Sequence, residues 1–382
     1  MRFSKTSSGR TGSGTAVATV GTRERKRRPS SVGVERAAST EPEADPIEYF
    51  LQDLRYHGRS ERTREAYGRV LRTFADFLAD RSTAGGRLAP VDAGQRECMA
   101  WVHSLRDAHS RSTVATYASY LHRFYRYMAQ AGVFESNPME LVVSEMDETI
   151  EKNPSRREIT LPAMRSFAQD VSHPLDRAVI LTLLKTGMRV GECCNLDLRD
   201  CALSGEWASE TYDLGSRAGL DNRPDSLLVA SDVARDQVTN GEERTASNKR
   251  RRTTVIPVDD ELRAALVRWL AVRPDARSVA EPLFCSTGGE WGKRLTPPMT
   301  RKLVEGHART AGWYRTGGGA EENVTPHYFR HFFTTHLRDR TGDRGVVKYL
   351  RGDVAEDVID TYTHNWGDRV REVYEANIYR LL

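Results

Sequence analysis

The segment TPHYFRHFFTTHL, residues 325–337, contains a helix start that decides how the second half of the chain folds. Thr325 is a favourable N-cap and Pro326 a favourable first helical residue, so we predict that a helix begins here. At about 100° per residue, the phenylalanines fall on one face, whereas His327, Arg330 and His331 fall on the opposite face. The helix therefore has one apolar face for a core and one cationic face.

The cationic face is consistent with contact to an anion. His327 lies in the first turn, where unpaired backbone N–H groups and the helix dipole favour a phosphate. A solvated helix face is the alternative, and the local pattern does not separate the two. A zinc site is disfavoured because Tyr328 stands where zinc proteases need glutamate. The five cysteines form no CxxC pair, and we expect neither a metal nor a cofactor.

The segment TGMRVGE, residues 186–192, predicts a turn between two helices, because Gly187 permits the change of direction. Arg189 and Glu192 are three residues apart, so the carboxylate can hold the guanidinium in one orientation. Pairs of this kind are also common as purely structural contacts.

The first half of the chain is predicted to be helical. Ser60 can cap a helix whose apolar stripe runs from Tyr67 to Leu78, and a second helix is expected from about Ser112 to Ala131. A shorter helix around Met99–Leu105 lies between them. We expect this helical module to end near Asn137-Pro138, because the residue before a proline disfavours helix.

The second half has a mixed pattern. Helix patterns occur at Leu161–Val171 and Asp176–Lys185, and β-branched strand patterns occur at Ser226–Ala230 and Arg252–Val258. We therefore predict a mainly α protein with a small antiparallel β-sheet. The polar, Gly-punctuated stretch 203–248, which contains the first of these strand patterns, is expected to form a long loop at the edge of the sheet.

Composition divides the chain further. Residues 1–43 are rich in Ser, Thr, Gly and Arg, and we predict a disordered basic tail. A helical domain is expected over 44–146, a polar linker over 147–157 and a larger domain over 158–382. The basic run in the tail can touch a nucleic-acid backbone or act as a localisation address, and a solvated tail is the alternative.

Charge and hydropathy limit the class of protein. Of 57 basic residues 8 are lysine, so 49 are arginine, a side chain suited to bidentate phosphate contacts. An excess of arginine can equally reflect GC-rich coding, so phosphate binding is one of two interpretations of this feature. No run approaches the roughly 18 apolar residues of a membrane span, and the N-terminus lacks a signal-peptide pattern. We expect a cytoplasmic protein with no membrane contact.

The C-terminal region carries a short helical pattern at residues 353–364, in which Tyr362 has the spacing of a half-buried aromatic. Tyr374 and Tyr379 follow closely. The apolar residues of 368–382 also recur at helical spacing, so this segment can pack on its own domain or on a neighbouring protomer.

Four motifs occur in a fixed order: a TGxRxxE turn, a lysine in a basic hairpin before a VIP strand, an HxxRH helix and a terminal YTH. Together they resemble the tyrosine recombinase, or phage integrase, family over about residues 44–382. The resemblance implies a two-domain clamp, with an N-terminal core-binding domain and a C-terminal catalytic domain.

The resemblance also implies roles for individual residues. Arg189 and Arg330 match the arginines that clamp the scissile phosphate, Glu192 matches the acidic support of the first arginine, and His331 matches a frequent histidine after the second. Tyr362 matches the nucleophile.

Proton transfer is implied for two further residues. Lys249 matches the hairpin lysine that protonates the leaving oxygen, and His327 matches the first histidine of the HxxR box. Asp353 departs from the family, because it stands where a histidine or tryptophan is usual about nine residues before the tyrosine. An ionised carboxylate cannot donate a hydrogen bond to a phosphate oxygen.

The resemblance implies a double-stranded DNA partner and thus a DNA-associated protein, and the basic side chains are candidates to contact the DNA. These candidates are Arg62, Arg64, Arg111, Arg123 and Arg126 in the first module and Arg250 and Arg251 beside the lysine. Simple solvation is the alternative for each of them.

The predicted function is site-specific DNA recombination through a covalent 3′-phosphotyrosine, without metal or ATP. We expect the protein to act as a homo-oligomer assembled on DNA, and a tetramer is one candidate. The alternatives are a DNA-binding protein of the same fold with weak or lost cleavage and a type IB topoisomerase.

Overall fold

The computed structural model describes residues 45–81, 88–150, 155–353 and 366–382. The chain divides into two compact units between Ile150 and Glu151. Each unit has its own hydrophobic core. The predicted tail, residues 1–43, lies outside the described residues.

The first unit is built from helices. They are α1 (Pro46–Tyr56), α2 (Glu61–Asp80), α3 (Gln95–Leu105), α4 (Arg111–Gln130) and α5 (Met139–Glu145). Ser60 caps α2 by accepting a hydrogen bond from Thr63 N, as predicted. Phe50, Phe74 and Trp101 are almost fully buried in the core, and burial of one such side chain contributes roughly 1.5–3 kcal/mol. The helices predicted for this half are confirmed.

The predicted end of this module at Asn137-Pro138 is wrong. Pro138 precedes α5, and the Asn137 side chain caps that helix by accepting a hydrogen bond from Met139 N at 3.1 Å. Met139 and Val142 then pack into the core of the first unit. A proline next to a helix N-terminus starts the helix, because its missing N–H has no partner there in any case.

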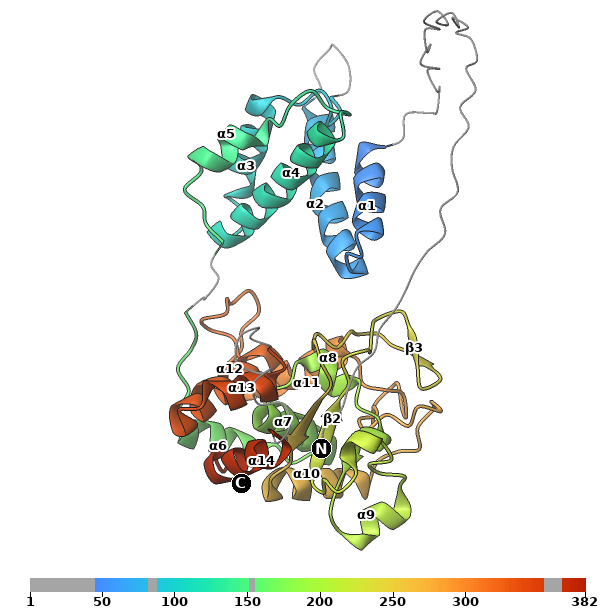
Figure 1. Ribbon diagram of the computed structural model, residues 1–382. Helices are drawn as coiled ribbons and strands as arrows, with labels where there is room; N and C mark the ends of the chain where they lie inside the picture. Colours follow the sequence, from blue (N-terminus) through green and yellow to red (C-terminus); the bar gives the residue numbers. More distant parts are fainter. Residues whose placement is uncertain (1–44, 82–87, 151–154, 354–365) are drawn as a thin grey trace, which may run out of the picture. The chain divides into compact units, whose positions relative to one another are not determined.

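The second unit combines helices with a small sheet. Its helices are α6 (Leu161–Asp170), α7 (Pro174–Thr186), α8 (Val190–Cys194), α9 (Glu206–Thr211), α10 (Asp260–Leu270), α11 (Pro297–Thr310), α12 (Pro326–Thr341), α13 (Arg344–Arg351) and α14 (Trp366–Asn377). Short 3-10 turns occupy Leu198–Asp200 and Ala218–Leu220. The helix α7 is buried on all sides, and α10 and α12 contact it (Figure 1).

The sheet of the second unit is antiparallel, as predicted. Its strand order is β1 (Cys201–Ala202), β2 (Ser226–Val229) and β5 (Thr254–Pro257), with Leu227 opposite Ile256. The long loop between β2 and β5 contains a separate hairpin of β3 (Val238–Thr239) and β4 (Glu242–Glu243). Mainly α architecture with a small antiparallel sheet is thereby confirmed.

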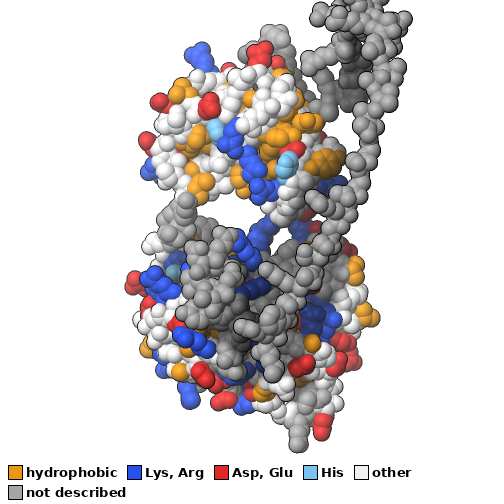
Figure 2. Space-filling model, in the orientation of Figure 1, with side chains coloured by type: hydrophobic (Ala, Val, Ile, Leu, Met, Phe, Trp, Pro, Cys, Tyr) orange, Lys and Arg blue, Asp and Glu red, His pale blue; other side chains and the backbone are white. Residues whose placement is uncertain are grey.

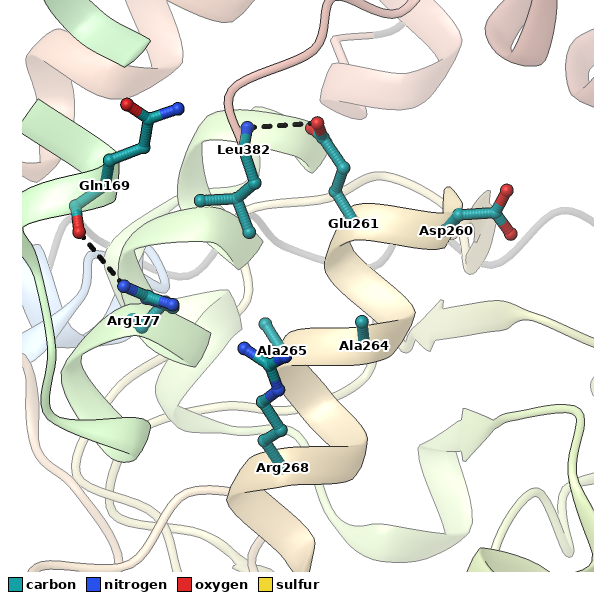
Figure 3. Close-up of a pocket in the computed structure, with 8 residues that line it drawn as sticks. All are labelled: Gln169, Arg177, Asp260, Glu261, Ala264, Ala265, Arg268 and Leu382. Carbon is teal, nitrogen blue, oxygen red and sulfur yellow. Dashed lines mark hydrogen bonds between the residues drawn. The ribbon is translucent and has the colours of Figure 1, made fainter. Parts of the chain in front are cut away.

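In the single chain that the structure describes, residues 366–382 pack on their own unit, and packing on a neighbouring protomer stays a prediction. Val370, Tyr374 and Tyr379 belong to the core of the second unit. Lys185, fully buried in α7, donates to Tyr379 O and to the carboxylates of Asp259 and Glu261. The last residues also donate their backbone N–H groups to Glu261, as Figure 3 shows for Leu382.

Candidate active site

The turn after α7 brings the first predicted arginine into position. Gly187 adopts a left-handed φ of 61°, which L side chains rarely tolerate. A Cβ there would lie 2.2 Å from Phe333 Cδ1, so α12 packs directly on this turn. The chain can therefore leave α7 and reach Arg189 only because residue 187 is glycine.

Arg189 is held by three groups. Its Nη1 donates to Glu192 Oε1 at 3.0 Å and to Lys249 O at 3.2 Å, and its Nη2 donates to Asp353 Oδ1 at 2.8 Å. Glu192 also accepts the backbone N–H of Arg189 at 2.9 Å, which closes the first turn of α8. The predicted pairing of Arg189 with Glu192 is present.

Arg330 bridges two helix ends. Its Nη1 donates to Gly187 O at 2.7 Å, after α7, and to Arg351 O at 2.9 Å, at the end of α13. Helix C-termini carry partial negative charge, so both contacts favour a cation. Its Nη2 donates to Asp353 Oδ1 at 2.8 Å. Burial and then the nearby Arg189 lower the pKa of Arg330 to about 10, and it stays charged at neutral pH.

The prediction that Arg250 contacts DNA is wrong. Its side chain is fully buried, with Nη2 3.1 Å from Glu192 Oε2 and Nη1 3.1 Å from Leu350 O. The guanidinium therefore links α8 to the end of α13. Arg251, in contrast, is exposed, and its DNA contact stays a prediction.

Lys249 lies in the loop between β4 and β5, and its side chain is exposed. Its backbone is fixed at the site, because Lys249 O accepts the hydrogen bond from Arg189 Nη1. Lys249 thus follows the β3–β4 hairpin in sequence, and its backbone lies next to Arg189. Its role as a proton donor stays a prediction.

Buried ion pairs hold this loop against the body of the unit. Asp197 accepts hydrogen bonds from Arg244 and from Arg294, and all three residues are buried. Arg294 also donates to Glu242 in β4. Buried ion pairs therefore anchor the hairpin of this loop, and Val233 near the start of the loop packs in a small apolar cluster with Leu220 and Leu228.

The two histidines of the cationic face lie on the first turns of α12. Both are open to solvent. Partial burial of the His327 ring, followed by the positive charges of Arg156 and Arg330, lowers its pKa, and His331 shifts in the same direction. A neutral imidazole can accept a proton. The helix start at Thr325–Pro326 is confirmed, although the Thr325 side chain makes no capping hydrogen bond.

Asp353 lies among the arginines. Its Oδ1 accepts from Arg189 and Arg330, and its Oδ2 lies 2.8 Å from Arg351 Nη2. Burial tends to raise the pKa of this carboxyl, but the three guanidinium groups outweigh that effect and lower it. The carboxylate is therefore charged. Sequence reasoning missed Arg351, although it lies two residues before Asp353 in the motif that departs from the family.

The predicted nucleophile, Tyr362, lies outside the described residues. The two nearby tyrosines can be assessed. Tyr374 and Tyr379 are fully buried, and they donate their hydroxyl hydrogens to the carbonyl oxygens of Lys185 and Leu184. Burial raises the pKa of both phenols well above the ordinary value. Neither hydroxyl is placed to attack a DNA strand.

The DNA-contact candidates of the first unit differ in their surroundings. Arg62, Arg111 and Arg126 are exposed, whereas Arg64 pairs with Glu61 and the Arg123 guanidinium lies 5.8 Å from the centre of the Tyr67 ring. Figure 2 shows basic side chains on the visible face of this unit. Their contact with DNA stays a prediction.

The second unit also has a surface pocket (Figure 3), whose lining residues include neither Arg189 nor Arg330. Arg177, in the first turns of α7, lines it together with Arg268 of α10 and the terminal Leu382. The arginine site begins at Gly187, at the other end of α7 and roughly 15 Å away at 1.5 Å per residue. Arg177 donates to the carbonyl oxygens of Val171 and Gln169, so its charge is used structurally.

The fold and the site define a class of protein: a helical unit joined to a mixed unit that presents clustered arginines suited to an anion. In the part of the chain that the structure describes, no group of three or more His, Cys, Asp or Glu side chains is arranged to hold a metal. No described helix is long and apolar enough to cross a membrane.

Comparison with known families identifies the chain. Residues 231–367 match the phage integrase family, and residues 47–133 match the phage integrase N-terminal SAM-like domain. The chain belongs to the tyrosine recombinase, or phage integrase, family, whose members cleave and rejoin DNA strands.

Relatives extend over most of the chain. The tyrosine recombinase XerC of Pelotomaculum thermopropionicum is 27% identical over 345 residues, covering 87% of this chain and 97% of that protein. Tyrosine recombinase XerC 1 of Ralstonia nicotianae is 26% identical, covering 91% and 97%.

Solved structures share the fold. A lambda integrase dimer bound to a COC′ core site has a TM-score of 0.56 at 14% identity, covering 82% of this chain and 95% of that chain. The Tn1549 transposon integrase in complex with a circular intermediate DNA has a TM-score of 0.55 at 17% identity, covering 86% and 94%.

Proposed function

We propose that this tyrosine recombinase cleaves and rejoins DNA at a specific site through Tyr362, with Arg189 and Arg330 as the phosphate clamp. One observation carries the assignment of the clamp. The Nη2 atoms of both arginines lie 2.8 Å from the same oxygen of Asp353, so two guanidinium groups from distant segments already converge on one anionic atom.

The chemistry follows from the charge that the reaction develops. The Tyr362 oxygen attacks phosphorus and forms a new P–O bond, while the bond from phosphorus to the 5′ oxygen breaks. The phosphoryl oxygens gain charge in the transition state, and fixed cationic donors stabilise that charge by several kcal/mol in enzyme sites. The clamp thus performs a task that many nucleases give to metal ions.

Two proton transfers complete the step. The phenol loses its proton to His327, whose lowered pKa keeps the imidazole neutral and able to accept it. Lys249 gives a proton to the leaving 5′ oxygen, and its backbone contact with Arg189 supports that position. The product is a 3′-phosphotyrosine and a free 5′-hydroxyl. A second 5′-hydroxyl can reverse the reaction and join new strands without ATP.

We further propose double-stranded DNA as the partner, contacted by a core-binding domain and by a catalytic domain. The DNA-bound relatives include a lambda integrase tetramer on a Holliday junction, with a TM-score of 0.54 at 15% identity, covering 82% of this chain and 78% of that chain. This supports assembly of several copies on DNA. Together with the family it also supports a DNA-associated protein, for which we propose a cytoplasmic location.

A nicked suicide duplex tests the proposal, because loss of the short 5′ product traps the covalent intermediate. Wild-type protein should give an adduct on a denaturing gel, and Tyr362→Phe should give none. Binding without any adduct would instead favour a DNA-binding protein that has lost cleavage, an alternative motivated by the carboxylate of Asp353 between the arginines. Relaxation of plasmids that lack a cognate site would favour a topoisomerase.

A further inference from the structure

Three guanidinium groups surround one carboxylate at the centre of the site. Asp353 Oδ1 accepts from Arg189 Nη2 and Arg330 Nη2, and Oδ2 lies 2.8 Å from Arg351 Nη2. A carboxylate with two oxygens held by arginine forks has the same contacts as two non-bridging oxygens of a phosphodiester. Asp353 therefore marks the position at which these arginines bind an anion.

The charges of the cluster are not balanced. Its cations are Arg189, Arg250, Arg330 and Arg351, and its anions are Glu192 and Asp353. Two positive charges remain in excess while Asp353 is in place, and three remain once its carboxylate moves away. Such an excess suits a phosphodiester, which carries one negative charge and gains more during the reaction.

The two carboxylates differ in how easily they can be displaced. Glu192 is fully buried, whereas the Asp353 side chain is 32% exposed. Asp353 lies beyond the end of α13, after the cap residue Gly352, and is the last described residue before position 366, so rotation of its side chain disturbs no described helix. A solvent-borne anion can therefore exchange with Asp353 but not with Glu192.

Arg351 has capacity for a further contact. Its side chain is 29% exposed, equal to that of Arg189, and its Nη2 faces Asp353. Its Nε is buried and has no hydrogen-bond partner among the residues that the structure describes. In the family motif the usual hydrogen-bond donor to the phosphate stands at the position of residue 353, where this chain has aspartate. The position of Arg351 is not the donor position of the motif.

We propose that Asp353 occupies the position of the scissile phosphate in the DNA-free protein, and that Arg351 is a third phosphate-binding arginine that passes to the DNA with Arg189 and Arg330 when Asp353 is displaced. This inference rests on the proposed function of the same site. Arg351 then donates the hydrogen bond to a phosphate oxygen that an ionised aspartate at position 353 cannot donate. Asp353 acts as a competing anion, which weakens the binding of any phosphate at this site.

The test compares Asp353→Asn, Arg351→Gln and the double variant on two duplexes. One duplex has an ordinary phosphodiester at the cleavage position, and the other has an uncharged methylphosphonate at that position only. Asp339→Asn is the matched control, because it removes the same charge from an exposed ion pair with Arg338 in α12. Affinity is measured by fluorescence anisotropy at fixed salt, and adduct formation by suicide cleavage.

Asp353→Asn should bind the phosphodiester duplex about five- to tenfold more tightly than wild type, the effect of removing one partly exposed competing ion pair. The gain should disappear on the methylphosphonate duplex and in the double variant. Arg351→Gln alone should lower the adduct rate at least tenfold, whereas Asp339→Asn should not distinguish the two duplexes.

Equal gains on both duplexes would overturn the proposal, because they would reflect net charge and not phosphate competition. A normal adduct rate in Arg351→Gln would also overturn it. Asp353→Ala serves as the second variant if Asp353→Asn is unstable. The anisotropy comparison needs no cleavage. A wild-type protein that forms no adduct would therefore contradict the proposed function, whereas this inference is tested separately by the affinities for the two duplexes.

Discussion

Replacing Glu192 by glutamine probes the support beneath the arginine clamp. The carboxylate is fully buried and accepts from Arg189 N at 2.9 Å, from Arg189 Nη1 at 3.0 Å and from Arg250 Nη2 at 3.1 Å. Arg250 is fully buried as well, and Glu192 is its only acidic partner in the part of the chain described by the structure. The substitution keeps the shape of the side chain but leaves the buried Arg250 guanidinium without its ion-pair partner.

Breaking one side of a buried ion pair costs about 3–5 kcal/mol. The amide oxygen still accepts one hydrogen bond, so the lower end, about 3 kcal/mol, is the expected loss in the free energy of unfolding. That is a large part of the 5–15 kcal/mol typical of a folded domain. With a urea m-value of about 3 kcal/mol per M, the midpoint should fall by about 1 M.

Urea unfolding followed by tryptophan fluorescence measures this loss. Trp269 and Trp313 lie in the second unit, and Trp101 is in the first unit, where the substitution should have no effect. Glu290→Gln, an exposed glutamate paired with Lys293, should leave the midpoint unchanged. The double variant Glu192→Gln/Arg250→Met should recover part of the loss, because the unpaired charge is gone. A loss below about 1 kcal/mol in the single variant would refute the reasoning.

Three further predictions concern neighbouring features. Gly187→Ala should lower the free energy of unfolding by about 2–4 kcal/mol, measured by urea unfolding, because it combines a left-handed backbone with a clash against Phe333; an unchanged midpoint would contradict the packing of α12 on this turn. Arg156→Gln should raise the pKa of His327 and His331, since its charge lowers both. The pKa values of both histidines in the folded protein lie below their ordinary value of about 6.5. Folding stability is therefore lost as pH falls below about 6.5. The acid limb of the cleavage profile should move to higher pH in Arg156→Gln, and an unmoved limb would exclude His327 as the proton acceptor. Lys185→Met should destabilise the second unit by about 3 kcal/mol in the same urea assay, because Asp259 and Glu261 lose their buried cation and the C-terminal segment loses its anchor; a stability equal to wild type would contradict packing of that segment on its own unit.

Local pattern was sufficient for much of the fold. The turn at Gly187 depends on the glycine itself, and the pairing of Arg189 with Glu192 joins residues three apart in the chain. Both features are visible in the sequence. The start of α12 at Pro326 and the strand before Val258 are equally local. These features were predictable because the interactions that define them join neighbours in the chain.

Other features depend on tertiary contacts that no local pattern contains. Arg250 belongs to a run of four basic residues that looks solvated, yet it alone is buried between Glu192 and the end of α13. Asp353 is an apparent defect in the motif, and its three arginine partners come from α12, α13 and the residue before α8. Only the folded chain brings these charges together.

The most direct test of the account is to identify the residue that carries the DNA. Wild-type protein is trapped on the suicide duplex and digested, and the peptide bearing a nucleotide remnant is sequenced by mass spectrometry. The account predicts a single modified residue, Tyr362, in a yield that Arg330→Ala abolishes while the protein still binds DNA. A modified residue elsewhere in the chain, or full yield from Arg330→Ala, would contradict it.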